Sequence, residues 1–204
     1  QQFDMAGLLS GDIDAAEAMT YNEYAMVLEA INPDTGALYT PEDFNVISYE
    51  DEGVGMLQDA IWADGSRLSD PTYVDTATKF VAASIQGWAF CRDNTQACTD
   101  IVVAMGSKLG ASHQLWQMNE VNKLIWPAPM GAGMIDDAAW DRTVTLSLEA
   151  KNLEGGTVLT AAPDAEAHTN DIVTAALALL ADMGVDTTGS AFAPITVTLN
   201  EGGN

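Results

Sequence analysis

The chain has 204 residues, of which 48% are hydrophobic and 18% charged, so it has enough apolar side chains for a sizeable core. It carries 30 Asp and Glu against 7 Lys and Arg, which gives a formal charge of −23. This charge excludes attraction to nucleic acid or to an anionic membrane face, and it favours a solvated surface suited to a salty medium. None of its apolar runs reaches the roughly 20 residues that a transmembrane helix needs.

The first residues, QQFDMAGLLSGDIDA, predict a helix that is already under way and ends at Gly11. They lack the basic region and the cleavage site of a signal peptide, so we expect the sequence to be part of a longer chain. Residues 12–19 predict a short strand. The next four residues, Thr20 to Glu23, have the spacing of a capping box and open a helix that extends to Ile31.

The rest of the chain alternates short strands with longer helices. Strands are predicted at 44–49 and 56–63, on either side of an acidic turn, and a last strand at 195–199. Pro71 stands near the first position of a long helix that extends to about Cys91. Further helices are predicted at 95–105, 112–126, 137–151 and 169–183. This alternation predicts an α/β architecture.

The two cysteines lie seven residues apart, at the expected junction of two helices. The first helix ends near Cys91, Asp93 or Asn94 caps the next one, and Cys98 falls in its first turn. Such a hairpin brings the two sulfur atoms within reach of each other. We therefore favour a Cys91–Cys98 disulfide, with two separate buried thiols as the alternative.

Five runs, taken in order, resemble the substrate-binding proteins of ABC importers. They are MTYNEY at 19–24, DFNVISYEDEGVGMLQDAIWA at 43–63, FVAASIQGWAFCRDNTQAC at 80–98, NEVNKLIWPAPMGAGMID at 119–136 and DTTGSAFAPITVTLNEGGN at 186–204. They are similar to the family that binds thiamine precursors of the hydroxymethylpyrimidine type, which is related to the nitrate-, sulfonate- and taurine-binding proteins.

The resemblance implies a partial type II periplasmic binding protein fold. Residues 1–55 would belong to the second lobe, 56–68 would cross between the lobes, and 69–204 would form the C-terminal part of the first lobe. The N-terminal segment of that first lobe would lie outside this sequence and act as its partner. The family also implies a periplasmic or extracellular protein that meets the membrane through the permease of its ABC transporter.

Two loops that follow predicted strands combine aromatic with acidic or amide side chains, as a cleft for a small heteroaromatic ring requires. For the first loop, at residues 20–23, the alternative is an ordinary capped helix, and for the second, at residues 49–52, it is a solvated acidic turn. For Trp62 the alternative is a position in the core. The predicted ligand-binding residues are Tyr21, Asn22, Glu23, Tyr49, Glu50 and Trp62.

The sequence thus predicts the solute-binding component of an importer, which captures a thiamine-pyrimidine precursor or a similar ring and needs no cofactor. A binding protein for a small anion is a second possibility, disfavoured because the two loops contain no Arg or Lys. A generic acidic interaction module is a third. A pyrimidine-synthase-like enzyme is disfavoured because no cysteine cluster is present and the lysines are expected to be exposed; these are Lys79, Lys108, Lys123 and Lys151.

The histidines do not indicate a metal site, because His113 and His168 lie far apart in sequence and form no paired motif. His113 and Trp116 share one face of a predicted helix, where core packing or a solvated cap is the expected role. His168 is expected in a loop ahead of the last helix.

Overall fold

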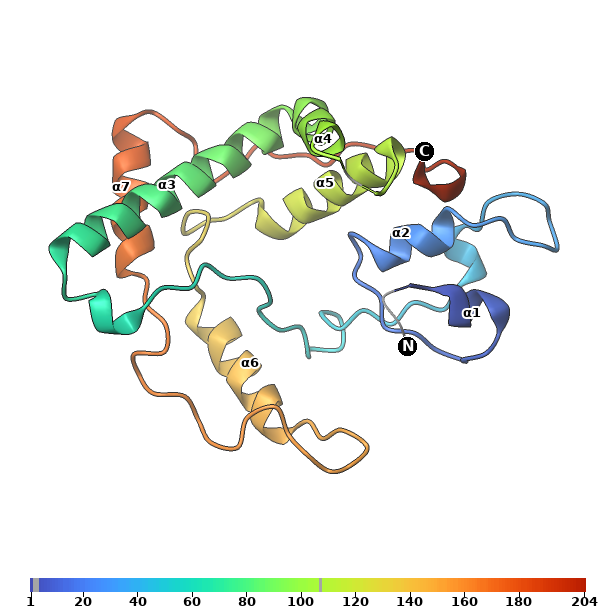
Figure 1. Cartoon of the computed structure of the whole chain (residues 1–204), viewed down its shortest axis with the longest axis horizontal. Helices are drawn as coiled ribbons and strands as arrows, with labels where there is room; N and C mark the ends of the chain where they lie inside the picture. Colours follow the sequence, from blue (N-terminus) through green and yellow to red (C-terminus); the bar gives the residue numbers. More distant parts are fainter. Residues whose placement is uncertain (2–3, 107) are drawn as a thin grey trace. The chain divides into compact units, whose positions relative to one another are not determined.

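The computed structural model of the chain describes residue 1, residues 4–106 and residues 108–204 (Figure 1). The described part contains seven α-helices and three short 3-10 helices. The α-helices are α1 (Ala6–Ser10), α2 (Glu23–Leu28), α3 (Pro71–Asp93), α4 (Thr95–Ala104), α5 (Ala111–Ile125), α6 (Asp137–Glu149) and α7 (Asp171–Asp182), and the 3-10 helices are η1 (Pro41–Asp43), η2 (Gly65–Arg67) and η3 (Glu201–Gly203).

Each helix expected from the sequence is present, with ends that differ by a few residues. Gly11 ends α1 in the left-handed conformation at φ 77°, which a glycine adopts without the strain that a Cβ atom brings. Pro71 is the first residue of α3, where its missing N–H leaves no helical hydrogen bond unmade. None of the helices in the described part of the chain is long and apolar enough to cross a membrane.

The predicted α/β architecture, and with it the type II periplasmic binding fold, is wrong for this structure. Residues 12–19, 44–49, 56–63 and 195–199 form no sheet, and the only β-pairing among the described residues is two isolated bridges, Ile31 with Leu38 and Lys151 with Thr157. A β-branched, apolar run favours an extended backbone, but a strand is stable only when a neighbour completes its hydrogen-bond ladder. These runs lack such a neighbour.

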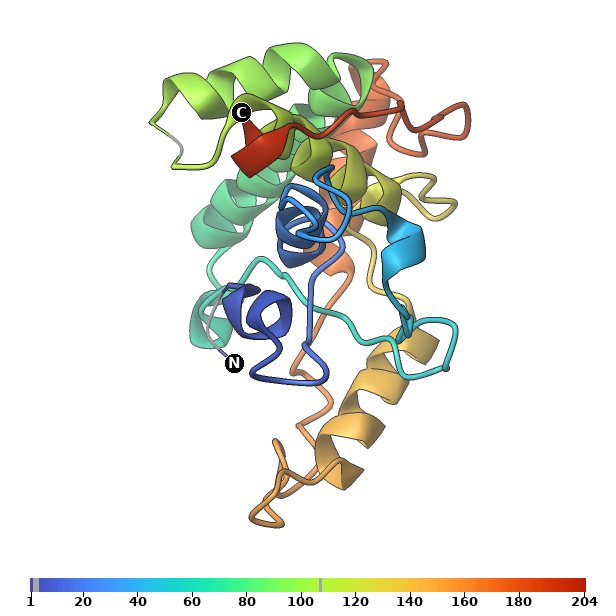
Figure 2. The same ribbon diagram turned by 90° about the vertical axis from the view of Figure 1, so that its right-hand side faces the viewer.

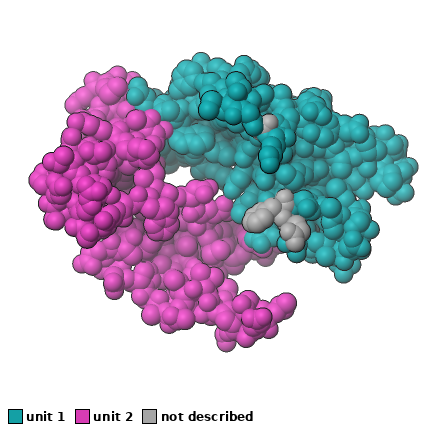
Figure 3. Space-filling model, in the orientation of Figure 1, with its two compact units in different colours: residues 1–45, 86–132, 186–204 teal, residues 46–85, 133–185 magenta. Residues whose placement is uncertain are grey.

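The chain divides into two compact units, each made of separate segments (Figure 3). Unit 1 contains Gln1–Asn45, Gln86–Ala132 and Asp186–Asn204, and unit 2 contains Val46–Ile85 and Gly133–Val185. The lobe boundaries predicted at residues 55 and 68 refer to the lobes of a periplasmic binding protein. The two units do not test these boundaries, which stay a prediction.

In unit 1, helices α2 and α5 pack together and the short η3 lies against both (Figure 2). The apolar core includes Met5, Val27 and Leu28, with Trp116 and Phe44 packed at its edge. The Nε1–H of Trp116 donates to the carbonyl oxygen of Thr20 at 2.9 Å, which ties α5 to the chain that leads into α2.

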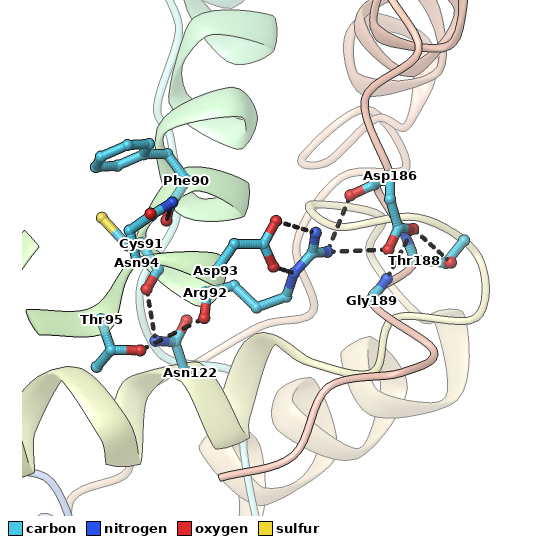
Figure 4. A network of polar contacts seen from close by, with 10 residues as sticks. All are labelled: Phe90, Cys91, Arg92, Asp93, Asn94, Thr95, Asn122, Asp186, Thr188 and Gly189. Carbon is cyan, nitrogen blue, oxygen red and sulfur yellow. Dashed lines mark hydrogen bonds and ion pairs between the residues drawn. The ribbon is translucent and has the colours of Figure 1, made fainter. Parts of the chain in front are cut away.

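The junction of α3 with α4 carries the predicted disulfide, which is confirmed: Cys91 and Cys98 are bonded across a sequence separation of seven. Beside it, Arg92 connects α3 to the turn that begins at Asp186 (Figure 4). Hydrogen bonding from this guanidinium holds the pKa of Asp93 below its usual range. The pKa of Asp186 is also lowered, first by the backbone N–H groups of Thr188 and Gly189.

In unit 2, one face of α7 is buried. Val173, Ala176 and Leu180 recur at helical spacing along this face. Gly133 approaches it so closely that a Cβ atom there would lie 3.1 Å from a methyl group of Val173 and 3.4 Å from Ile85 of α3. Helix α6 belongs to the same unit.

Candidate functional site

A hollow in unit 2 begins on one face of α6. Asp137, Trp140, Asp141 and Val144 lie at positions i, i+3, i+4 and i+7 of this helix, a spacing that places their side chains in one column. Asp136 is the N-cap residue of the helix, and its side chain accepts a hydrogen bond from the N–H of Ala139 at 2.8 Å. This cap fixes the first turn, from which Asp137 and Trp140 extend.

The opposite wall is the loop that follows α6 and turns back along it (Figure 1). The turn is made by Asn152 and Gly156, joined by backbone and side-chain hydrogen bonds of 2.9 Å. Leu159 then donates its N–H to the carbonyl oxygen of Ser147 at 2.8 Å, which holds the returning chain against the helix. Further along, Asn170 exchanges two hydrogen bonds of 2.9 Å with the backbone of Ile135 and so anchors the loop near the start of α6.

An aromatic pair joins the helix to the loop. The rings of Trp140 and His168 lie with centroids 4.1 Å apart and planes inclined by 33°. His168 Nε2 also lies 3.7 Å from a carboxylate oxygen of Asp137. Both rings are partly buried. The hollow therefore has an aromatic side and an acidic side at the same end of α6.

The hollow has a volume of about 450 Å³, within the roughly 300–1,000 Å³ of small-molecule sites. Its wall consists of Asp137, Trp140, Asp141, Val144, Ala162, Pro163, Asp164, Ala165 and His168. Three of these are carboxylates and none is Lys or Arg. The nearest arginine along α6, Arg142, donates instead to the carbonyl oxygen of Gly55 at 2.6 Å.

This arrangement suits a flat ring with a positive charge or hydrogen-bond donors. A ring stacked on an aromatic face gains dispersion and quadrupole attraction, and carboxylates accept charge-assisted hydrogen bonds from amino groups. A protonated or quaternary nitrogen would in addition be attracted by the face of Trp140. An anion would meet three carboxylates in a wall that contains no Lys or Arg.

The first predicted loop, Tyr21 to Glu23, lies in unit 1 and is engaged with its own unit. Asn22 precedes α2, and its Oδ1 lies 3.0 Å from Nε2 of His113. Glu23 is buried, and its carboxylate accepts a hydrogen bond from the N–H of Met19 at 3.1 Å. The capping box predicted at Thr20 is wrong, because α2 begins at Glu23 with Asn22 as its N-cap residue and no side-chain cap. Tyr21 is half-buried.

The second predicted loop lies in unit 2. Tyr49 and Glu50 are exposed residues of a turn that Gly53 completes at φ 73°. Glu50 lies 3.9 Å from the guanidinium of Arg142. Trp62 is 86% exposed, so the alternative of a core position is wrong for it. The six predicted residues fall in two different units, and their joint role in a binding site stays a prediction.

The sequence analysis did not predict the hollow, although the pattern of the residues on its helix side is apparent in the sequence. Asp137, Trp140 and Asp141 place an aromatic ring between two carboxylates on one helix face, which is unusual for a face that packs into a core. The loop side is not apparent there, because the contact of His168 with Trp140 depends on a long loop that returns to the helix. His168 was expected in a loop, as observed, but with no role.

Among the residues that the structure describes, no cluster of three His, Cys, Asp or Glu is arranged to hold a metal ion. His113 is fully buried, in agreement with the expected core packing. Comparisons of the chain with protein-family models, with curated proteins and with solved structures find no match.

Proposed function

We propose that this chain binds a small heteroaromatic solute that bears amino groups or a positive charge, and that it serves as the solute-binding component of an importer. The observation that carries the binding step is the hollow on α6, in which the Trp140–His168 pair adjoins three carboxylates. The ligand would lie against the aromatic pair and direct its donors to Asp137, Asp141 or Asp164. A thiamine-pyrimidine precursor has both features.

The importer role rests on the sequence resemblance alone, which covers five runs in order. The Cys91–Cys98 disulfide supports an exported protein, because disulfides persist mainly in oxidising compartments. A periplasmic or extracellular location, with a permease as partner, is part of the proposal.

Two features weigh against the other candidate functions. A binding site for nitrate, a sulfonate or taurine needs cationic groups, and the wall of the hollow contains neither Lys nor Arg. A pyrimidine-synthase-like enzyme needs a lysine for its Schiff base, and Lys79 and Lys123 form ion pairs with Asp75 and Glu120 on helix surfaces. We therefore propose a binding protein without catalytic activity.

The test is mass spectrometry of the small molecules released when the natively purified protein is denatured, followed by calorimetric titration of a defined panel. The panel contains hydroxymethylpyrimidine and thiamine as amino-heteroaromatics, and nitrate and taurine as anions. We expect a released heteroaromatic, and heat of binding from the first two compounds only. Binding of the anions with no response to either heteroaromatic would overturn the proposal.

A further inference from the structure

Residues 46–63 of unit 2 expose a series of large apolar side chains to solvent. Single exposed apolar side chains are common on protein surfaces, but a group of them close together marks an interaction site. The two most exposed are Ile47, at 73%, and Trp62, at 86%. The whole group consists of Val46, Ile47, Tyr49, Val54, Met56, Leu57, Ile61 and Trp62.

The backbone at the end of this segment is open as well. No hydrogen bond joins residues 58–63 to the rest of the chain that the structure describes. The segment is nevertheless held at both ends, because the N–H of Leu57 donates to Oγ1 of Thr143 on α6 and the N–H of Asp64 donates to the hydroxyl of Tyr73 on α3, each at 2.9 Å. Unpaired N–H and C=O groups between two fixed ends are a template for a further strand.

The order of side chains along this segment indicates what a pairing strand would contain. Successive side chains of a strand point to opposite faces, so Leu57, Asp59 and Ile61 share one face when the segment is paired. Opposite charges across a strand pair are stabilising, whereas like charges are destabilising. A complementary strand therefore places a Lys or Arg opposite Asp59 and apolar residues opposite Leu57 and Ile61.

The charge of the surrounding chain also requires a basic partner. Arg142 of α6 lies 3.9 Å from Glu50 but donates to the carbonyl oxygen of Gly55. Residues 46–64 themselves contain no Lys or Arg and five carboxylates, which are Glu50, Asp51, Glu52, Asp59 and Asp64. A second copy of the chain would bring the same carboxylates, and a formal charge of −23, to the contact. Repulsion therefore opposes pairing between two copies.

We propose that residues 57–63 bind an extended segment of another protein by β-strand addition, and that this segment carries a Lys or Arg flanked two residues away on each side by apolar residues. The backbone of residues 58–63 supplies the hydrogen bonds, and Asp59 with its two apolar neighbours selects the sequence. Because both ends are already held, less conformational entropy is lost on binding. The interaction uses none of the residues that line the hollow on α6 and is independent of the solute.

The test is an NMR titration of the full chain with two synthetic peptides of alternating threonine and valine. The central valine is replaced by lysine in the first peptide and by glutamate in the second. We expect the lysine peptide to shift the amide signals of residues 58–63 and to slow their hydrogen exchange, and the glutamate peptide to bind about tenfold more weakly. Equal affinities, or an absence of any change at residues 58–63, would overturn the proposal.

Charge reversal separates pairing at Asp59 from general attraction to an acidic chain. In Asp59→Lys we expect the preference to be reversed, because the like-charged pair then forms with the lysine peptide. Asp51→Lys is the matched control, since it makes the same change of charge in the neighbouring exposed turn and should keep the wild-type preference. A preference that changes equally in both variants would show that only net charge matters and would contradict the proposal.

A substitution in the backbone tests strand pairing itself. Ala60→Pro should abolish binding of both peptides, because proline removes an N–H from the ladder, whereas Ala60→Ser should bind like the wild type. The helical circular dichroism of both variants should be unchanged, since the N–H of Ala60 has no partner in the described chain. Binding that survives Ala60→Pro would refute strand addition. Sedimentation that reveals a dimer with slow exchange at residues 58–63 would instead assign this edge to a second copy and overturn the proposal.

Discussion

Arg92 shows how a single side chain can connect segments far apart in sequence. Its Nε and Nη2 donate to the two carboxylate oxygens of Asp93 at 2.7 and 2.9 Å, and Nη1 donates to the backbone oxygen of Asp186 at 3.0 Å (Figure 4). The guanidinium carbon lies 4.6 Å from the ring centre of the buried Trp126. With only 7% of its side chain exposed, Arg92 both packs and bonds.

We expect Arg92→Ala to lower the free energy of unfolding by about 2 kcal/mol, because a charge-assisted hydrogen bond and a cation–π contact are lost together. Chemical denaturation measures the loss. The matched control is Arg67→Ala, since Arg67 also lies over an aromatic ring, 4.2 Å from that of Tyr73, but is exposed. The control should change stability by less than about 0.5 kcal/mol. Equal effects of the two substitutions would contradict this assignment.

At the residue scale, the sequence was informative where partners are close along the chain. The Cys91–Cys98 bond was predicted because seven residues and one helix junction separate the two cysteines. The contact of Trp140 with His168 was not, because 28 residues separate the rings and the turn at Asn152 decides where the loop returns. The environment of His113 also depends on remote partners, since Glu29 is 84 residues away.

At the element scale, helix α7 illustrates why the predicted helices formed. Its apolar residues recur with the period of a helix, and the face that contains Leu180 is buried. Such a pattern is complete within one segment, because helical hydrogen bonds join residues of the same segment. The predicted strands differ, because each one needs hydrogen bonds from another segment that the local pattern does not identify.

We expect Leu180→Ala to destabilise unit 2 by about 3 kcal/mol, because a fully buried side chain leaves a cavity when it is shortened. Leu180 is 1% exposed, whereas its neighbour Leu179 is 42% exposed. Leu179→Ala is therefore the matched control and should cost under about 1 kcal/mol. Thermal and urea unfolding, followed by helical circular dichroism, compare the two. A larger loss for Leu179→Ala would show that α7 is rotated about its axis.

The disulfide between α3 and α4 is the second test at this scale. Because it closes a short loop, we expect its removal to lower the free energy of unfolding by about 2 kcal/mol. Urea unfolding of the wild type, with and without reductant, should be compared with Cys91→Ala/Cys98→Ala. The double variant should match the reduced wild type and should not respond to reductant. A wild-type protein that yields two alkylatable thiols without reductant would contradict the bond.

At the scale of the whole molecule, the charge of −23 and the acidic hollow are consistent with each other. The chain carries 30 Asp and Glu but only 7 Lys and Arg, so few cationic side chains are available to line a binding site. A cationic or amino-bearing ligand therefore suits it better than an anion. From the sequence, an anionic ligand was disfavoured because the two predicted loops contain no Arg or Lys. The sequence did not predict which carboxylates would gather beside an aromatic ring, because that depends on how the loop after α6 folds back.

The most direct measurement of the central claim is calorimetric titration of hydroxymethylpyrimidine into the wild type, Trp140→Ala and Trp62→Ala. Trp140 lies in the hollow, whereas Trp62 belongs to the site predicted from the sequence and is exposed. Loss of a stacked ring costs about 1–3 kcal/mol, which corresponds to roughly ten- to hundredfold in affinity. We predict that Trp140→Ala weakens binding to this extent and that Trp62→Ala binds like the wild type, with the helical circular dichroism of both variants unchanged. Wild-type affinity in Trp140→Ala, or a loss confined to Trp62→Ala, would contradict the account and place the ligand elsewhere.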